Sequence, residues 1–189
     1  MKKAVFIDRD GVIIEERNYA YKVEDLAFIP GSIDALKALA KTDYVIIIVT
    51  NQAGIARGYF TEKDYNAFTA HMLRLLKDAG ARVDGVYFCP HHPAEGVGKY
   101  RVDCDCRKPK TGMIDSAAGD FGIELGSSWF IGDKSSDILA GKSAGCRAVL
   151  VKTGYGGKDA GNGTEPDYVT DDLNSAVRLI LDKSAQGCF

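Results

Sequence analysis

A continuous run of β-branched residues is the feature that most constrains the fold of this chain. Val45-Ile-Ile-Ile-Val49 is typical of a strand at the centre of a parallel sheet, covered on both faces. Shorter apolar segments also predict strands, and segments with helical spacing lie between most of them. Strands that alternate with helices imply right-handed crossovers, so we predict an α/β protein with a three-layer α/β/α, Rossmann-like parallel sheet. The expected strands are residues 4–7, 44–50, 86–88, 129–131 and 147–151, with an edge strand at 168–169.

The length of 189 residues fits one domain, residues 1–189, with a substantial buried core. Lys and Arg number 24 and Asp and Glu number 26, so the net charge of -2 offers no field for a nucleic-acid backbone. The longest apolar runs are far too short to cross a bilayer, and the N-terminus lacks the apolar stretch of a signal peptide. We therefore expect a cytoplasmic protein with no nucleic-acid or membrane partner, and we expect it to be a monomer.

Three of the predicted strands run directly into acidic or hydroxyl residues. Asp8 and Asp10 follow the first strand, Thr50 ends the second, and Asp133 follows the fourth. The carboxyl ends of parallel strands share one rim of the sheet, which is where ligands bind in open α/β folds. Plainer interpretations remain, since Asp-Gly is a common turn pair and Asp133 is well placed to begin a helix. The expected convergence on one rim favours a binding site.

Several carboxylates in a small volume repel one another and raise their own pKa values, and a divalent cation relieves this repulsion. Oxygen-only ligands and an open site point to Mg²⁺, which keeps waters and shares a substrate phosphate. Asp137 lies one helical turn beyond Asp133, and Arg107, Lys108 and Lys134 supply positive charge opposite the acids. Such a set suits phosphoryl transfer, in which charge on the phosphoryl oxygens must be neutralised. A carboxylate can also attack phosphorus itself and form an aspartyl-phosphate, while a second acid handles the protons.

Residues 89–109 form a long irregular stretch that is rich in Cys, His and Gly, and such loops are usually functional or held by something. Three thiolates and one imidazole are a usual composition for a structural zinc site. The candidate Zn²⁺ ligands are Cys89, His91, Cys104 and Cys106. Their spacing is tighter than in most zinc sites, so reduced surface thiols are the alternative, and His92 is a rival ligand. Zinc here would act on catalysis only by making the segment after Cys106 rigid.

Four short motifs occur in order between residues 4 and 151. They are Asp8-x-Asp10-Gly11, the strand-ending Thr50, Lys108 before Pro109, and Gly132-Asp133-x-x-x-Asp137. Together they resemble the signature of the haloacid dehalogenase superfamily of phosphatases. The resemblance implies that Asp8 is the nucleophile and Asp10 the general acid and base, with Thr50 and Lys108 stabilising the phosphoryl group. The implied Mg²⁺ ligands are Asp8, Asp10 through its backbone carbonyl, and Asp133.

The Cys-x-His and Cys-x-Cys pairs before Arg107 narrow this resemblance to one branch of the superfamily. That branch contains the heptose bisphosphate phosphatases and the histidinol-phosphate phosphatases. Thr50-Asn-Gln-Ala-Gly-Ile-Ala-Arg-Gly58 and the length of the zinc-binding loop are especially similar to the heptose enzymes. The match is also capless, because no inserted domain follows the first or second motif. One departure is Val12, where many relatives carry Thr.

A capless fold leaves substrate choice to the loops. By their place in the motifs, the substrate contacts implied by the resemblance are Glu16, Arg17, Asn18, Tyr19, Asn51, Gln52, Ala53, Arg107 and Lys134. Arg107 is expected to recognise the phosphate that is not removed.

The resemblance implies hydrolysis of the C7 phosphate of a heptose 1,7-bisphosphate through an aspartyl-phosphate, in the synthesis of nucleotide-activated heptose. The expected partner is a small phosphorylated sugar, with Mg²⁺ as the catalytic and Zn²⁺ as the structural cofactor. A histidinol-phosphate phosphatase is the alternative within the branch. A non-catalytic module that binds zinc and a second cation is the alternative from another class. The glycine-rich stretch 154–163 is interpreted as a flexible surface connector.

Overall fold

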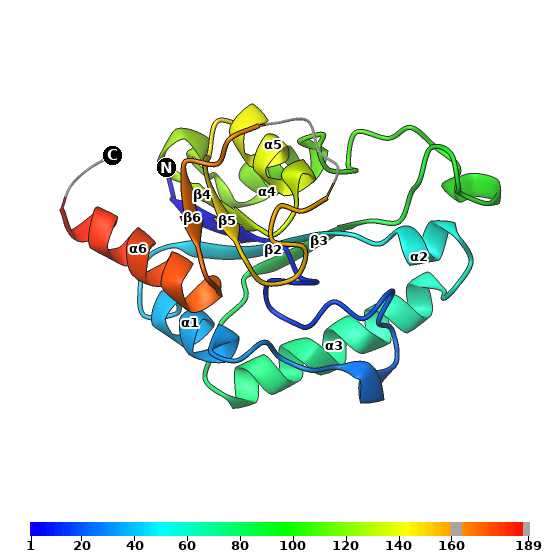
Figure 1. Ribbon diagram of the computed structural model, residues 1–189, viewed down its shortest axis with the longest axis horizontal. Helices are drawn as coiled ribbons and strands as arrows, with labels where there is room; N and C mark the ends of the chain where they lie inside the picture. Colours follow the sequence, from blue (N-terminus) through cyan, green and yellow to red (C-terminus); the bar gives the residue numbers. More distant parts are fainter. Residues whose placement is uncertain (160–163, 187–189) are drawn as a thin grey trace.

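Six parallel strands form one sheet in the order β3-β2-β1-β4-β5-β6 (Figure 1). The computed structural model describes residues 1–159 and 164–186. The strands are β1 (Ala4–Ile7), β2 (Val45–Asn51), β3 (Gly85–Cys89), β4 (Trp129–Gly132), β5 (Arg147–Val151) and β6 (Tyr168–Thr170). The predicted parallel sheet is confirmed, and the β-branched run of β2 lies inside it, between β1 and the edge strand β3.

Helices cover both faces of the sheet and make three layers. They are α1 (Ser32–Leu39), α2 (Ala53–Ala56), α3 (Glu62–Asp78), α4 (Gly112–Phe121), α5 (Ser135–Ser143) and α6 (Leu173–Ala185). In Figure 1, α1, α3 and α6 lie on one side of the strands, and α4 and α5 lie on the other. Short 3₁₀ turns occur at Val23–Asp25, Gly98–Tyr100 and Leu125–Ser127.

The central strands have two buried faces because alternate side chains point to opposite sides of a strand. In β1, Val5 and Ile7 pack with α1, α3 and α6. Ala4 and Phe6 pack instead with α4 and α5, where Phe6 stacks against Phe130 at a ring-centroid distance of 6.4 Å. This two-sided burial fixes the register of β1 against β2 and β4, and so fixes where the strands end.

The helix starts follow local capping chemistry. Helix α3 begins with a capping box, in which the Thr61 and Asp64 side chains each bond the other's backbone N–H. Ser32 is of a residue type that often caps a helix, but Gly31 occupies the cap position of α1 and Ser32 is already helical. Helix α5 begins before its first large apolar residue, because the carboxylate of Asp137 accepts the backbone N–H of Lys134 at 3.1 Å.

The connection from β1 to α1 carries only one 3₁₀ turn, so no cap domain interrupts this part of the chain. The loop between β3 and α4, coloured green, extends away from the sheet beside α2 (Figure 1). None of the helices in residues 1–159 and 164–186 has the length and apolar character needed to cross a bilayer.

Candidate active site

The carboxyl ends of β2, β1 and β4 meet at one rim of the sheet. Asp8 follows β1, and its backbone N–H donates to the carbonyl of Ile131 in β4 at 2.9 Å. Thr50 lies at the end of β2 and Asp133 follows β4. These residues come together because their strands are neighbours in the sheet, although 125 positions separate Asp8 from Asp133 in the chain.

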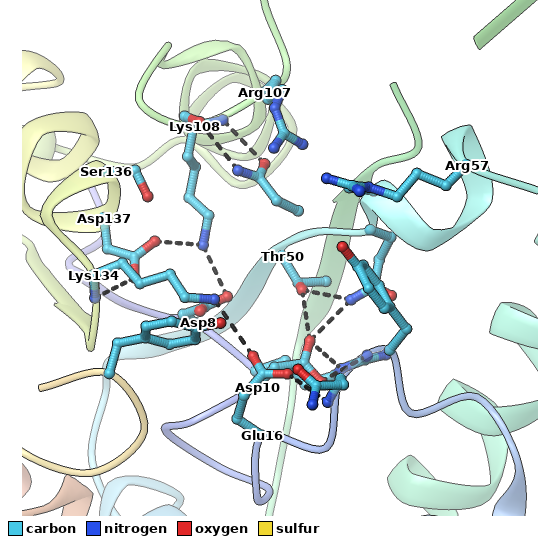
Figure 2. Close-up of a pocket in the computed structure, with 17 residues that line it drawn as sticks. Asp8, Asp10, Glu16, Thr50, Arg57, Arg107, Lys108, Lys134, Ser136 and Asp137 are labelled. Carbon is cyan, nitrogen blue, oxygen red and sulfur yellow. Dashed lines mark hydrogen bonds and ion pairs between the residues drawn. The ribbon is translucent and has the colours of Figure 1, made fainter. Parts of the chain in front are cut away.

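A pocket of about 290 Å³ opens at this rim (Figure 2). The predicted residues that line it are Asp8, Asp10, Glu16, Asn18, Tyr19, Thr50, Asn51, Gln52, Ala53, Arg107, Lys108 and Lys134. Arg17 does not line the pocket, because its exposed guanidinium pairs with Glu15 at 2.7 Å. The lining residues that the sequence did not assign to the site are Arg9, Arg57, Ser136 and Tyr155, and Asp137 lines it as well.

Asp8, Asp133 and Asp137 form a cluster of buried carboxylates. Each offers an oxygen, and these oxygens all lie within 4.8 Å of one another. Burial raises the pKa of Asp8 to about 6, against the opposing effect of Lys108. Burial, with added repulsion from Asp8 and Asp137, raises the pKa of Asp133 to about 8. Within the described chain, Oδ1 of Asp133 is buried and has no hydrogen-bond partner.

These acids fit Mg²⁺. Asp133 Oδ1, which no described residue bonds, and two neighbouring acids give the hard oxygen ligands that Mg²⁺ prefers. The open pocket leaves room for waters and a phosphate. The carboxylate of Asp10 lies outside the cluster, so only its backbone carbonyl remains as the ligand that the resemblance implies. Magnesium bound here would neutralise charge on a phosphoryl oxygen.

Lys108 brings positive charge to the same point. Its buried Nζ lies 2.8 Å from Asp8 Oδ1 and 2.7 Å from Asp137 Oδ1 (Figure 2). The same Nζ donates to the carbonyl of Val49 at 2.9 Å. Burial opposes the charged form, but the two carboxylates outweigh it and raise the pKa of Lys108. The Asn51 amide bonds both the N–H and the carbonyl of Lys108 at 3.0 Å, which fixes the lysine backbone.

Four hydrogen bonds that were not foreseen from the sequence hold the Asp10 carboxylate. Arg9 donates to both of its carboxylate oxygens, at 3.1 and 2.9 Å, and Thr50 and Gln52 donate to Oδ2 at 3.3 and 3.0 Å. The Arg9 side chain is buried, with its guanidinium 5.1 Å from the ring centroid of Phe68. An arginine between two acids at the end of a buried strand was the signal available in the sequence.

The segment after β5 closes the back of the acid cluster. Two backbone N–H groups of this segment bond Asp133: that of Tyr155 donates to Oδ2 at 2.7 Å and that of Gly157 donates to the carbonyl at 2.8 Å. The Thr153 hydroxyl donates to the Gly11 carbonyl at 2.7 Å. Gly154 has a φ of +59°, and a Cβ there would overlap the Asp133 carboxylate. The interpretation of this stretch as a surface connector was therefore wrong for its first residues, while residues 160–163 lie outside the described chain.

The four predicted zinc ligands also lie together. Sγ of Cys104 is 3.4 Å from that of Cys89 and 3.2 Å from that of Cys106, and Nδ1 of His91 lies 3.5 Å from Cys106 Sγ. A tetrahedral Zn²⁺ with Zn–S bonds of about 2.3 Å places its ligand sulfurs about 3.8 Å apart, so the group fits zinc after small shifts. The rival His92 is engaged elsewhere, since its Nδ1 accepts the N–H of Glu95 at 3.0 Å.

Fold and site together define the haloacid dehalogenase class of hydrolases. Its elements here are the acid pair after β1, the hydroxyl at the end of β2, the buried lysine and the acids that begin α5.

Comparison with known proteins agrees with this class and narrows it. A family model described as HAD-hydrolase-like matches residues 105–176. The D-glycero-beta-D-manno-heptose-1,7-bisphosphate 7-phosphatase of Pasteurella multocida is 44% identical over 95% of this chain and 97% of its own. The corresponding alpha-anomer enzyme of Burkholderia mallei is 44% identical over 79% of each chain. The D,D-heptose 1,7-bisphosphate phosphatase of B. bronchiseptica, solved with magnesium and phosphate, superposes with a TM-score of 0.85 at 34% identity, covering 96% of this chain and 99% of that one.

The chain therefore belongs to the family of D-glycero-D-manno-heptose 1,7-bisphosphate 7-phosphatases, within the haloacid dehalogenase superfamily.

Proposed function

We propose that this protein is a Mg²⁺-dependent phosphatase that hydrolyses the C7 phosphate of D-glycero-D-manno-heptose 1,7-bisphosphate, as a step in nucleotide-heptose synthesis. The observation that carries the proposal is the buried Lys108, which joins Asp8 and Asp137 in the pocket. Oxygens of these two acids lie within 4.8 Å of an oxygen of the buried Asp133, whose Oδ1 has no hydrogen-bond partner among the described residues. The identity of the substrate is inferred from the relatives, which are named for a heptose 1,7-bisphosphate. We further propose that residues 1–189 act as one cytoplasmic, monomeric domain without a nucleic-acid or membrane partner.

In the proposed mechanism, a carboxylate oxygen of Asp8 attacks the phosphorus atom of the C7 phosphate. The bond from phosphorus to the sugar oxygen breaks, an aspartyl-phosphate forms, and Asp10 donates a proton to the leaving alkoxide. Asp10 then accepts a proton from a water that attacks the aspartyl-phosphate, which releases phosphate and restores Asp8. Lys108 and the Thr50 hydroxyl stabilise the charge on the transferring group.

The Thr50 hydroxyl also bonds the acid and base Asp10. This hydroxyl donates to Asp10 Oδ2 at 3.3 Å and accepts from Gln52 at 2.8 Å. A hydroxyl has one proton to donate, so bonding a phosphoryl oxygen would release its bond to Asp10. Arg9 and Gln52 keep the Asp10 carboxylate in place during this exchange.

Phosphate release from four substrates tests the proposal. These are the alpha and beta anomers of the heptose 1,7-bisphosphate, heptose 7-phosphate and histidinol phosphate. We expect kcat/KM to be highest for one of the bisphosphates, because relatives are named for each anomer. A higher kcat/KM for histidinol phosphate would contradict the sugar substrate. Lack of turnover with all four would favour the non-catalytic zinc and cation module.

A further inference from the structure

Arg57 is a cation in the pocket that the proposed mechanism does not use. It directly follows α2, its side chain is 28% exposed, and its guanidinium lies 5.6 Å from the ring centroid of Tyr19. Within the described residues, its Nε is buried and lacks a hydrogen-bond partner. A guanidinium donates in a planar fork that suits carboxylate and phosphate, so this unfilled donor beside a pocket points to a missing acceptor.

Arg57 and Arg107 approach the same part of the pocket from different segments. Figure 2 shows both guanidinium groups on the side away from Lys134 and Asp137. The lysines at the other end already have acidic partners, whereas Arg107 donates to a neutral acceptor, the His91 carbonyl, at 3.2 Å. The far end of the pocket therefore carries more positive charge than its immediate partners neutralise.

One carboxylate does contact Arg57. Glu95, in the loop between the two halves of the zinc cluster, forms an ion pair with it. The Glu95 side chain is 50% exposed, and ion pairs this open to water contribute little. A phosphate bound bidentately by guanidinium groups inside the pocket is a stronger partner. The Val97 N–H donates to the Ala56 carbonyl at 2.8 Å, so backbone bonding ties Glu95's loop to the end of α2.

We propose that Arg57 and Arg107 jointly bind the second phosphate of the sugar bisphosphate, and that this phosphate displaces Glu95 from Arg57. The inference rests on the proposed function. It adds Arg57 as a second arginine that binds this phosphate, and Glu95 as a carboxylate that competes with the phosphate for Arg57. It makes the loop from Cys89 to Cys106 part of substrate selection, since that loop holds both Glu95 and the segment leading to Arg107. Two residues in contact then affect binding in opposite directions, which a purely structural ion pair does not do.

The test measures binding without turnover in the Asp8→Asn background. Calorimetry with Mg²⁺ gives the Kd of heptose 1,7-bisphosphate and of heptose 7-phosphate, and their ratio isolates the contribution of the second phosphate. Arg57→Met should reduce that preference about tenfold or more, the loss of a charge-assisted hydrogen-bond pair. Glu95→Gln should increase it about two- to fivefold, because a weak exposed competitor is gone. Arg57→Lys should retain part of the preference, since it keeps the charge without the fork.

Arg101→Met is the matched control, because Arg101 is an exposed arginine of the same loop that does not line the pocket. It should leave the preference unchanged, and circular dichroism should show all variants folded. An unchanged ratio in Arg57→Met, or equal affinity of the parent protein for both ligands, overturns the inference. A lower ratio in Glu95→Gln overturns the counter-ion role. Phosphate release by the wild-type protein tests the proposed function separately, so either proposal can fail while the other stands.

Discussion

Nζ of Lys108 lies 2.8 Å from Oδ1 of Asp8, although 100 positions separate the two residues in the chain. The same ammonium group lies 2.7 Å from Asp137 and bonds the end of β2 through the Val49 carbonyl. One buried cation thus joins three segments at the pocket floor. It also places positive charge where a phosphoryl group attacked by Asp8 would lie.

Replacing Lys108 by Met should impair both activity and stability. Loss of one transition-state partner is expected to lower kcat about 10²- to 10³-fold. Removing one member of a buried ion pair destabilises a protein by about 3–5 kcal/mol, because the remaining charge is left without compensation. Thermal melting and phosphate release measure the two effects, with the exposed neighbour Lys110→Met as control. An unchanged Tm would show that Asp8 and Asp137 do not depend on Lys108.

Replacing Asp8 by Asn should abolish turnover, because an amide oxygen does not replace a carboxylate nucleophile. The fall in kcat is expected to exceed about 10³-fold while far-UV circular dichroism stays unchanged. Mass spectrometry after rapid acid quenching should detect a phosphoryl group on Asp8 in the wild-type protein. Asp103→Asn, at a largely exposed side chain, is the control. Appreciable turnover by Asp8→Asn would rule out the nucleophile assignment.

The stability of the metal-free protein should fall as pH rises through the range set by its buried acids. The ordinary pKa of Asp8 and Asp133 is 3.8, and folding raises it to about 6 and about 8. The folded state therefore binds more protons than the unfolded state above pH 3.8, and its stability falls until each folded pKa is passed. Mg²⁺ binds the deprotonated acids, so it should raise the Tm more at pH 8 than at pH 6. Melting curves with and without Mg²⁺ check this, and an equal Mg²⁺ effect at both pH values would contradict it.

Removing zinc should weaken the enzyme without changing its chemistry. The cluster directly precedes Arg107 and Lys108, so a loosened loop is expected to misplace both cations. A chelator followed by refilling with Mg²⁺ should leave low activity and a lower Tm, and added Zn²⁺ should restore both. Metal analysis of the purified protein should find bound zinc. Full activity in the zinc-free, Mg²⁺-loaded protein would refute the positioning role.

Replacing Gly154 by Ala should disturb the acid cluster from behind. The added Cβ would overlap the Asp133 carboxylate at a backbone conformation that L-residues avoid. We expect weaker Mg²⁺ binding, measured by calorimetry, and lower kcat. Gly119→Ala is the matched control, because Gly119 lies in α4 with open space around its Cβ position and alanine favours helix. Equal Mg²⁺ affinity in the two variants would mean that Asp133 tolerates movement of its neighbour.

Local patterns were enough to predict much of the site. Asp8, Thr50 and Asp133 could be placed on one rim because each ends or follows an apolar segment whose strand character is encoded locally. The strand β5 ends at the same rim, so the rule that identified those residues also applied to Thr153 and Tyr155. The glycine-rich composition of that stretch pointed instead to a connector.

The sequence by itself determined the parallel sheet, the identities of the acids and cations, and the composition of the zinc cluster. Each of these features is encoded by residues that lie close together in the sequence. Runs of β-branched residues favour buried strands, and the zinc-ligand types recur at short spacings. Only the tertiary structure decided which groups act on one another: Arg9 on Asp10, Gly154 behind Asp133, and Arg57 with Glu95. Those contacts depend on the strand order β2-β1-β4-β5 and on side-chain packing, and the spacing of residues along the chain encodes neither.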